Sequence, residues 1–162
     1  MTQYSEDDKK YMKMALEEAA TGIGKTDFAP SIGCVIVKDG RIIGKGRTSD
    51  GGVPHAEANA LQMAYDNGED PTGSTVYVTL EPCFTADPGA ETPCSKLLID
   101  AKIARMVTAL QDPDHKTNGR GTEILKELGI ETQVGLYAEE AMEQNMWFYE
   151  SRMFKTDNVT YI

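Results

Sequence analysis

Four side chains with the chemistry of a catalytic metal centre lie in two short stretches of the sequence. His55 is followed two residues later by Glu57, and Cys83 is followed by Cys94 beyond residues 84–93. One imidazole and two thiolates can hold Zn²⁺ by three ligands and leave the fourth position for water. The Glu57 carboxylate is not needed as a ligand, so it can carry protons to and from that water and a substrate. The pattern predicts a zinc site made by His55, Cys83 and Cys94, with Glu57 as the catalytic acid and base.

Two plainer interpretations of these residues stay open. Lone histidine and cysteine residues are often packed core residues, although three of them in this order, with a nearby carboxylate, fit that poorly. A structural zinc site would need a fourth protein ligand, which Cys34 or His115 would have to supply. We interpret Cys34, inside an apolar run, as a core thiol. We interpret His115 as a loop histidine, with a substrate contact as the alternative.

Composition narrows the class of protein. The 162 residues suffice for one domain with a sizeable core. With 16 basic and 26 acidic side chains the net charge is −10, which repels nucleic-acid phosphates. The sequence has no apolar run of membrane-spanning length and no apolar signal-peptide core near its start. Three cysteines at this spacing suit a metal better than disulfides. We therefore expect a cytoplasmic protein that binds neither nucleic acid nor membrane.

Alternating helix and strand patterns indicate how the four residues are positioned. Helices are predicted from the Ser5 N-cap to about residue 21, and at 56–67, 95–100, 122–128 and 139–154. Strands are predicted at 32–37, 41–46, 75–80, 105–110 and 130–134, with a hairpin turn at Asp39-Gly40. His55 and Cys94 then lie at two helix N-termini, whose positive dipole ends favour anions. The alternation indicates one α/β domain with helices on both faces of a sheet.

The histidine, glutamate and Pro-Cys spacing is typical of zinc deaminases of nucleobases. Moreover, the sequence resembles the deaminase domain of the bifunctional riboflavin-biosynthesis deaminase/reductase family over about residues 11–152. The resemblance is carried by residues 32–40, 55–61, 78–83, 92–94, 111–114, 119–121 and 128–130, and by Glu140-Ala141, Asn145 and Phe148. The long stretch between the two cysteines also fits this family.

The resemblance implies a three-layer α/β/α cytidine-deaminase-like fold with a mixed five-stranded sheet. It implies Zn²⁺ as cofactor and hydrolytic removal of an amino group from a ribosylated diaminopyrimidinone phosphate, which releases ammonia. In that family a reductase domain follows the deaminase. Here we expect a deaminase domain at 1–154, a polar tail at 155–162 and no reductase domain, so that a separate reductase is a possible partner. Proteins of this fold are commonly dimers or tetramers, so we expect a homo-oligomer.

The sequence departs from the family at several expected substrate contacts. Ala29 stands where the family has an asparagine that contacts the base, and Thr48 where it has a histidine. Phe84 begins the loop between the cysteines in place of a serine, and residues 89–91 replace a basic stretch. Each lost hydrogen bond to a buried base typically costs about 1–3 kcal/mol. These positions, Ala29, Thr48 and Phe84, are nevertheless the ones at which we expect substrate contacts.

Other candidates come from charge and from apolar patterning. Asp112 resembles a family position near the site, although an Asp-Pro turn would look the same. Candidates to bind a substrate phosphate are Arg47, Lys96 and Arg120, although such side chains are usually only solvated. The last helix carries an apolar stripe that we interpret as core or subunit packing, made by Met142, Met146, Trp147 and Phe148.

Three functional hypotheses follow. The first is a stand-alone deaminase of the riboflavin-pathway pyrimidine. The second is a deaminase of the same fold that acts on another nucleobase, nucleoside or pterin, which the altered loops favour. The third is a deaminase-like scaffold that binds a partner protein. Glu57 argues against the scaffold, because a scaffold has no need for a carboxylate beside an open metal position.

Overall fold

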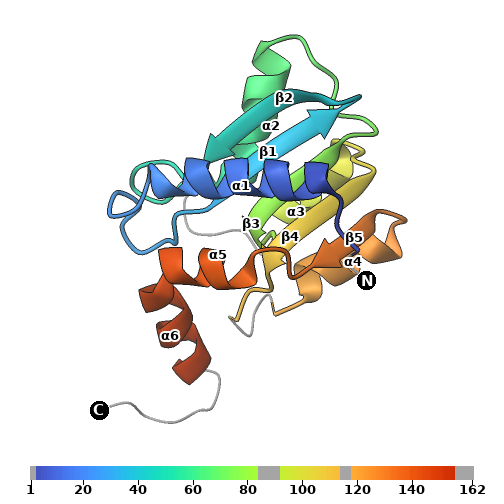
Figure 1. Ribbon diagram of the computed structural model, residues 1–162. Helices are drawn as coiled ribbons and strands as arrows, with labels where there is room; N and C mark the ends of the chain where they lie inside the picture. The colour runs from blue at the N-terminus through green and yellow to red at the C-terminus, as the bar shows by residue number, and fades with distance from the viewer. Residues whose placement is uncertain (1–2, 84–91, 114–117, 156–162) are drawn as a thin grey trace.

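A five-stranded mixed sheet forms the centre of the molecule in the computed structural model, which describes residues 3–83, 92–113 and 118–155 (Figure 1). The strands lie in the order β2-β1-β3-β4-β5. Their bounds are β1 Gly33–Lys38, β2 Arg41–Arg47, β3 Thr75–Leu80, β4 Arg105–Leu110 and β5 Glu131–Val134. The helices are α1 Glu6–Ala20, α2 Ala56–Asp66, α3 Cys94–Asp100, α4 Arg120–Glu127, α5 Ala138–Gln144 and α6 Met146–Lys155.

Strand directions divide the sheet into two parts. β1 is antiparallel to both β2 and β3, whereas β3, β4 and β5 run parallel to one another. The β1–β2 hairpin turns at Asp39 and Gly40, whose φ angles of 52° and 75° match the two left-handed positions of a type I′ turn. The predicted hairpin and the predicted mixed five-stranded sheet are both confirmed.

Helices cover both faces of the sheet. Helices α1 and α5 lie over one face, and α2, α3 and α4 lie over the other (Figure 1). Because successive side chains of a strand point to opposite faces of the sheet, β1 contributes side chains to two hydrophobic cores. Cys34 and Ile36 enter the core beneath α2 and α3, while Val35 and Val37 enter the core beneath α1. The structure confirms the three-layer α/β/α fold.

Parallel pairing brings the ends of β3 and β4 to the same edge of the sheet. The backbone N–H of Glu81, the residue after β3, donates to the Leu110 carbonyl oxygen over 2.9 Å. Cys83 follows the end of β3, and Asp112 follows the end of β4. Both Cys83, a candidate metal ligand, and Asp112, a candidate substrate contact, therefore lie at this edge of the sheet.

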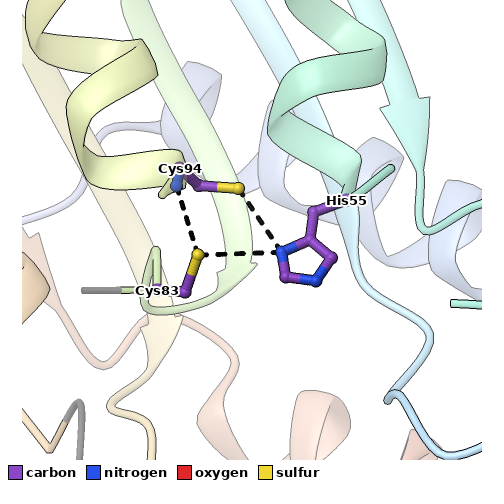
Figure 2. A group of neighbouring side chains, drawn as sticks. All are labelled: His55, Cys83 and Cys94. Atoms are coloured by element: carbon purple, nitrogen blue, oxygen red, sulfur yellow. Dashed lines mark hydrogen bonds between the residues drawn. The ribbon is translucent and has the colours of Figure 1, made fainter. Parts of the chain in front are cut away.

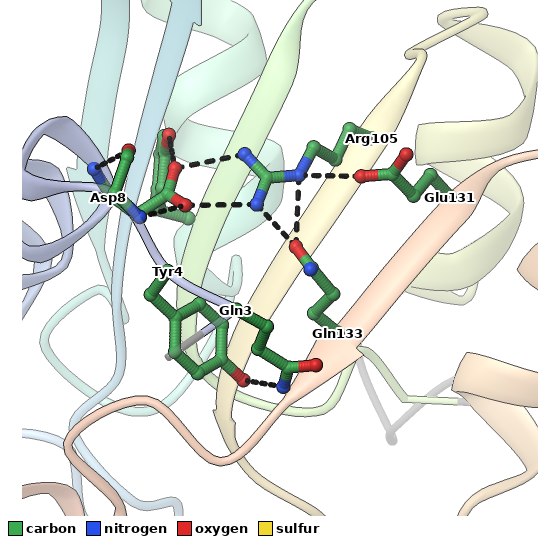
Figure 3. Close-up of polar contacts among 8 residues, drawn as sticks. Gln3, Tyr4, Asp8, Arg105, Glu131 and Gln133 are labelled. Carbon is green, nitrogen blue, oxygen red and sulfur yellow. Dashed lines mark hydrogen bonds and ion pairs between the residues drawn. The ribbon is translucent and has the colours of Figure 1, made fainter. Parts of the chain in front are cut away.

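A polar network joins α1 to the other end of the same strands (Figure 3). Arg105, the first residue of β4, donates from its two terminal nitrogens to the Asp8 carboxylate over 2.8 and 2.9 Å. The Tyr77 hydroxyl donates to the same carboxylate over 2.7 Å. Glu131 and Gln133 of β5 also contact the guanidinium group, at 2.9 and 3.0 Å from its Nε atom. Asp8 and Arg105 together thus link α1, β3, β4 and β5.

The C-terminal helix differs from the prediction. The other predicted elements begin and end within two residues of the observed ones, but the single helix predicted at 139–154 is two helices, α5 and α6. The break is at Asn145, with φ −136° and ψ 40°. Its side chain accepts from the Ser31 N–H over 2.9 Å and donates to the Ser31 carbonyl over 2.8 Å. The helix is therefore interrupted where the Asn145 side chain binds the backbone of Ser31.

The apolar stripe of this region is divided between core and surface. Phe148 is 4 % exposed and packs in the core, whereas Met146 and Trp147 are 40 % and 49 % exposed. The polar tail was predicted at 155–162, but Lys155 is still the last residue of α6, and residues 156–162 lie outside the described residues. Within the described ranges, no helix reaches the length and apolar character that crossing a membrane requires.

Candidate metal centre

The N-terminus of α2 presents His55. This residue is the N-cap of α2, in extended conformation, and its side chain makes no capping hydrogen bond. Its Nδ1 atom instead faces two cysteine sulfurs (Figure 2). The loop that leads into His55 is tied to the helix by Asn59, whose side-chain amide donates to the Arg47 carbonyl over 2.7 Å and to the Ser49 hydroxyl over 2.8 Å.

Cys83 and Cys94 complete a three-residue cluster around the imidazole. His55 Nδ1 lies 3.8 Å from Cys83 Sγ and 3.4 Å from Cys94 Sγ. All three candidate ligand atoms lie within 4.8 Å of one another. The backbone N–H of Cys94, the first residue of α3, donates to Cys83 Sγ over 3.1 Å. As predicted, two helix N-termini converge on one site, and the donor set suits a metal ion with a preference for nitrogen and sulfur.

The two thiols differ in protonation. Hydrogen bonding from Cys94, with a further contribution from His55, lowers the pKa of Cys83 to about 5. The pKa of Cys94 is raised well above its ordinary value, because it donates to Cys83 and is buried. Near neutral pH the pair therefore holds one negative charge and one proton. A bound cation would stabilise both thiolates and displace that proton.

Glu57 lies in the first turn of α2 and is 4 % exposed. Burial raises the pKa of its carboxyl to about 7, and the electrostatic interaction with the His55 imidazole opposes that shift. A carboxyl with a pKa near neutrality can both accept and return a proton under physiological conditions. The site thus combines three potential metal ligands with a buried carboxyl two residues from one of them.

The predicted alternatives for a fourth protein ligand fare differently. Among residues 3–83, 92–113 and 118–155, the group that could hold a metal is His55, Cys83 and Cys94. Cys34 is not part of it: its side chain is fully buried in the core, and burial raises the pKa of its thiol. His115 lies outside the described residues.

Ala29 and Thr48 lie in two adjoining segments. The Thr48 hydroxyl donates to the Pro30 carbonyl over 3.0 Å and accepts from the Ile32 N–H over 2.9 Å. Thr48 is 1 % exposed, so it fixes the backbone that follows Ala29. Asn145 holds the same segment through Ser31. A substrate contact by either Ala29 or Thr48 stays a prediction, and that of Phe84 lies outside the described residues.

The candidates for a phosphate contact are mostly engaged in ion pairs. Arg47 donates to Asp50 over 2.9 Å, and Lys96 to Asp100 over 3.0 Å. Arg120 is exposed at the first position of α4. These three therefore stay predictions as phosphate ligands.

The carboxyl end of the parallel strands contains Asp112, 8 % exposed. Its backbone N–H donates to Glu81 Oε1 over 3.0 Å. Three polar residues that organise this site were not assigned a role from the sequence, namely Asn59, Glu81 and Asn145. For Asn59 and Glu81 the signal was a polar side chain between apolar neighbours, which marks a buried group that needs hydrogen-bond partners. Asn145 follows Glu143 and Gln144, so its surroundings in the sequence gave no such signal.

Comparison with known proteins agrees with this geometry. Residues 5–110 match the family model of the cytidine and deoxycytidylate deaminase zinc-binding region. The chain is 45 % identical over 141 residues to the riboflavin biosynthesis protein RibD of Escherichia coli K12, covering 87 % of this chain and 37 % of that protein. It is 37 % identical to the diaminohydroxyphosphoribosylamino-pyrimidine deaminase of Buchnera aphidicola from Schizaphis graminum, covering 88 % of this chain and 94 % of that deaminase.

A solved structure has a similar fold. The diaminohydroxyphosphoribosylaminopyrimidine deaminase/5-amino-6-(5-phosphoribosylamino)uracil reductase of Thermotoga maritima superposes with a TM-score of 0.84 at 37 % identity. The match covers 91 % of this chain and 42 % of that one. The chain thus spans well under half of the bifunctional relatives but nearly all of the Buchnera deaminase. From its fold, its cysteine and histidine cluster and these matches, the chain belongs to the cytidine and deoxycytidylate deaminase family.

Proposed function

We propose that this protein is a zinc-dependent hydrolytic deaminase of a small aminated heterocycle. The observation that carries the proposal is the buried Glu57 carboxyl beside a cluster of three metal-ligand atoms within 4.8 Å of one another. A structural zinc site has four protein ligands and needs no such acid. The same feature argues against a scaffold without catalytic activity.

The chemistry of the donor set fits Zn²⁺. In this proposal His55, Cys83 and Cys94 hold the ion, and the dipoles of α2 and α3 favour the negative thiolates. Zn²⁺ bound here supplies an activated water near neutral pH. His55 and Cys83 are partly exposed while Cys94 is buried, so the open side of the cluster is the side from which substrate and water can enter.

Glu57 carries the protons in this mechanism. A nearby cation favours its ionised form, so its carboxylate is ready to accept a proton from the attacking water. The carboxyl then delivers that proton to the ring nitrogen of the substrate. It next takes the remaining proton from the added hydroxyl group and passes it to the amine, which leaves as the C–N bond breaks and the carbonyl forms. Burial opposes the effect of the cation, because in the metal-free protein it raises the pKa of Glu57 to about 7, and the carboxyl can therefore take up and return a proton. The products are ammonia and the intact ring, with a carbonyl oxygen in place of the amino group.

We infer that the substrate is the ribosylated diaminopyrimidinone phosphate of riboflavin biosynthesis. The support is the 37–45 % identity to proteins that carry this deaminase activity or pathway in their names. One observation favours a second candidate, another nucleobase, nucleoside or pterin. Ala29 has no hydrogen-bonding side chain, and both functions of the Thr48 hydroxyl are bonded to backbone. A cytoplasmic homo-oligomer and a separate reductase partner stay predictions.

The test is ammonia release by the zinc-loaded protein with a panel of substrates. The panel holds the ribosylated diaminopyrimidinone phosphate, cytosine, guanine, their nucleosides and simple pterins. Turnover of the pathway phosphate alone supports the first candidate, and turnover of another compound supports the second. No ammonia from any of them would contradict the proposed function.

A further inference from the structure

The carboxylate of Glu81 joins the segment that carries Cys83 to the start of α4. Glu81 directly follows β3 and is 3 % exposed. Its Oε1 atom accepts from the backbone N–H groups of Asp112 over 3.0 Å and Gly119 over 2.8 Å. Its Oε2 atom accepts from the Thr122 N–H over 3.1 Å. All three hydrogen bonds described for this carboxylate are donated by the backbone of the β4–α4 connection and the first turn of α4.

Glu81 takes the place of a helix N-cap. The N-cap residue of α4 is Gly119, with φ 91° and no side chain to cap the helix. The Thr122 N–H, at the third position of the helix, is a donor that an N-cap side chain normally satisfies. The negative charge of a carboxylate at this position also interacts favourably with the positive end of the helix dipole. Glu81 therefore supplies from β3 the cap that α4 lacks.

The first turn of α4 lies directly on the peptide that precedes Cys83. A Cβ atom at Gly121 would overlap the Pro82 carbonyl oxygen and come within 3.3 Å of Glu81 Oε2. Glycine at this position permits the approach, because any side chain would push the helix away. The carboxylate and the close contact together fix residues 81–83 against α4.

Cys83 is also held from the opposite direction, by α3. The Ser95 N–H donates to the Cys83 carbonyl over 3.2 Å, and the Cys94 N–H to Cys83 Sγ over 3.1 Å. Helix α3 therefore binds Cys83 directly, through the carbonyl oxygen and Sγ of that residue. Helix α4 holds Cys83 indirectly, through Glu81 and Pro82. We propose that Glu81 is a positioning residue that fixes Cys83 Sγ in the candidate metal centre and also anchors the backbone of Asp112. This inference rests on the proposed zinc function.

The test compares Glu81→Gln with Tyr77→Phe. The glutamine keeps the shape of the side chain, but its NH2 group is a donor. It therefore cannot accept a hydrogen bond from the backbone N–H group or groups that it faces. We expect its zinc affinity, from chelator competition, to fall at least about tenfold. We also expect faster amide exchange at Gly119 and Thr122, and an altered absorption spectrum of the Co²⁺-loaded protein. Tyr77→Phe removes a buried hydrogen bond of 2.7 Å at the other end of the sheet. Its zinc affinity should stay within about twofold of the wild type.

Wild-type zinc affinity and amide exchange in Glu81→Gln would overturn the inference. An equal loss of affinity in Tyr77→Phe would also overturn it, because the effect would then be general destabilisation. If the wild-type protein binds no zinc, the proposed function fails separately. Amide exchange then decides the role of Glu81: faster exchange at Gly119 and Thr122 supports it, and unchanged exchange refutes it.

Discussion

The surroundings of a buried carboxyl, and not its burial alone, decide what it can do in the candidate metal centre. Glu57 and Glu81 are both carboxylates near Cys83, yet they are suited to different tasks. Glu81 is surrounded by three N–H donors, which hold it as an acceptor. Glu57 is buried, and burial raises its pKa to about 7, so its proton can be exchanged near neutrality. The environment, rather than the residue type, assigns one to position the backbone and the other to move protons.

Glu57→Gln should separate metal binding from catalysis. The amide has nearly the same shape as the carboxyl but cannot accept and return a proton, so turnover should fall by at least about 10²–10⁴-fold. Zinc content, measured by atomic absorption, should stay near that of the wild type because Glu57 is not a ligand in this account. Ammonia release above a tenth of the wild-type rate would contradict the assigned role.

The protonation of the two cysteines predicts how zinc affinity depends on pH. The pKa of Cys94 is raised well above its ordinary value, so its thiol keeps its proton at neutral pH in the metal-free protein. Zinc must displace that proton, and a higher pH makes the displacement easier. We expect affinity to rise about tenfold from pH 7 to pH 8, with proton release detected by calorimetry in buffers of different ionisation enthalpy. An affinity independent of pH would show that Cys94 is already ionised.

At the scale of elements, close packing of α2 on β2 positions His55 and Glu57. A Cβ atom at Gly44 would overlap the Ala60 carbonyl oxygen of α2, and one at Gly46 would lie 2.8 Å from the Ala60 nitrogen. On the other face, a Cβ atom at Gly33 would overlap the Ala15 carbonyl oxygen of α1. The two helices therefore approach the sheet in the same way, but α2 bears the site.

Because α1 and α2 each pack closely on a glycine of the sheet, the two glycines offer a matched pair of substitutions. Gly44→Ala should push α2 outward, lower the free energy of unfolding by about 1–3 kcal/mol and weaken zinc binding. Gly33→Ala should cost a similar amount of stability through α1 but leave zinc affinity nearly unchanged. Thermal unfolding and chelator competition measure the two effects. Equal zinc affinity in both variants would mean that the packing of α2 does not set the ligand geometry.

The sequence predicts most elements because their signals are local. The Ser5 cap, the Asp39-Gly40 turn and the apolar periodicity each act within a few residues. The break at Asn145 was not predicted, because its cause is Ser31, which lies 114 positions away in the chain. The grouping of His55, Cys83 and Cys94 was expected from their chemistry and spacing, and the structure brings their ligand atoms within 4.8 Å of one another. The cap that Glu81 provides for α4 depends on how β3 and α4 pack, which no local pattern reveals.

At the scale of the whole molecule, one charged network holds the end of the sheet opposite the metal centre. Asp8 and Arg105 join α1 to the strands, and Tyr77 adds a hydrogen bond (Figure 3). The Arg105 guanidinium, together with the Tyr77 hydroxyl, holds the pKa of Asp8 well below its ordinary value of 3.8. The negative charge of Asp8 therefore stabilises the fold.

Asp8→Asn should remove this stabilisation in a pH-dependent way. Because the pKa of Asp8 is depressed in the folded protein, its contribution is fully present above its ordinary pKa and is lost as pH falls below it. Above pH 5 the variant should be about 1.5–3 kcal/mol less stable than the wild type. Denaturant unfolding between pH 7 and pH 2.5 should show the difference shrinking below pH 4. A difference that stays constant down to pH 2.5 would show that the Asp8 charge is not responsible.

The most direct test of the account is a zinc titration of ammonia release. Metal-free protein receives increasing zinc with the substrate identified from the panel, and ammonia and bound zinc are measured together. The account predicts that the rate rises in proportion to zinc bound, stops at one ion per chain, and is absent in Glu57→Gln that has bound the same amount. Ammonia release without zinc, or a rate that does not follow the zinc bound, would contradict it.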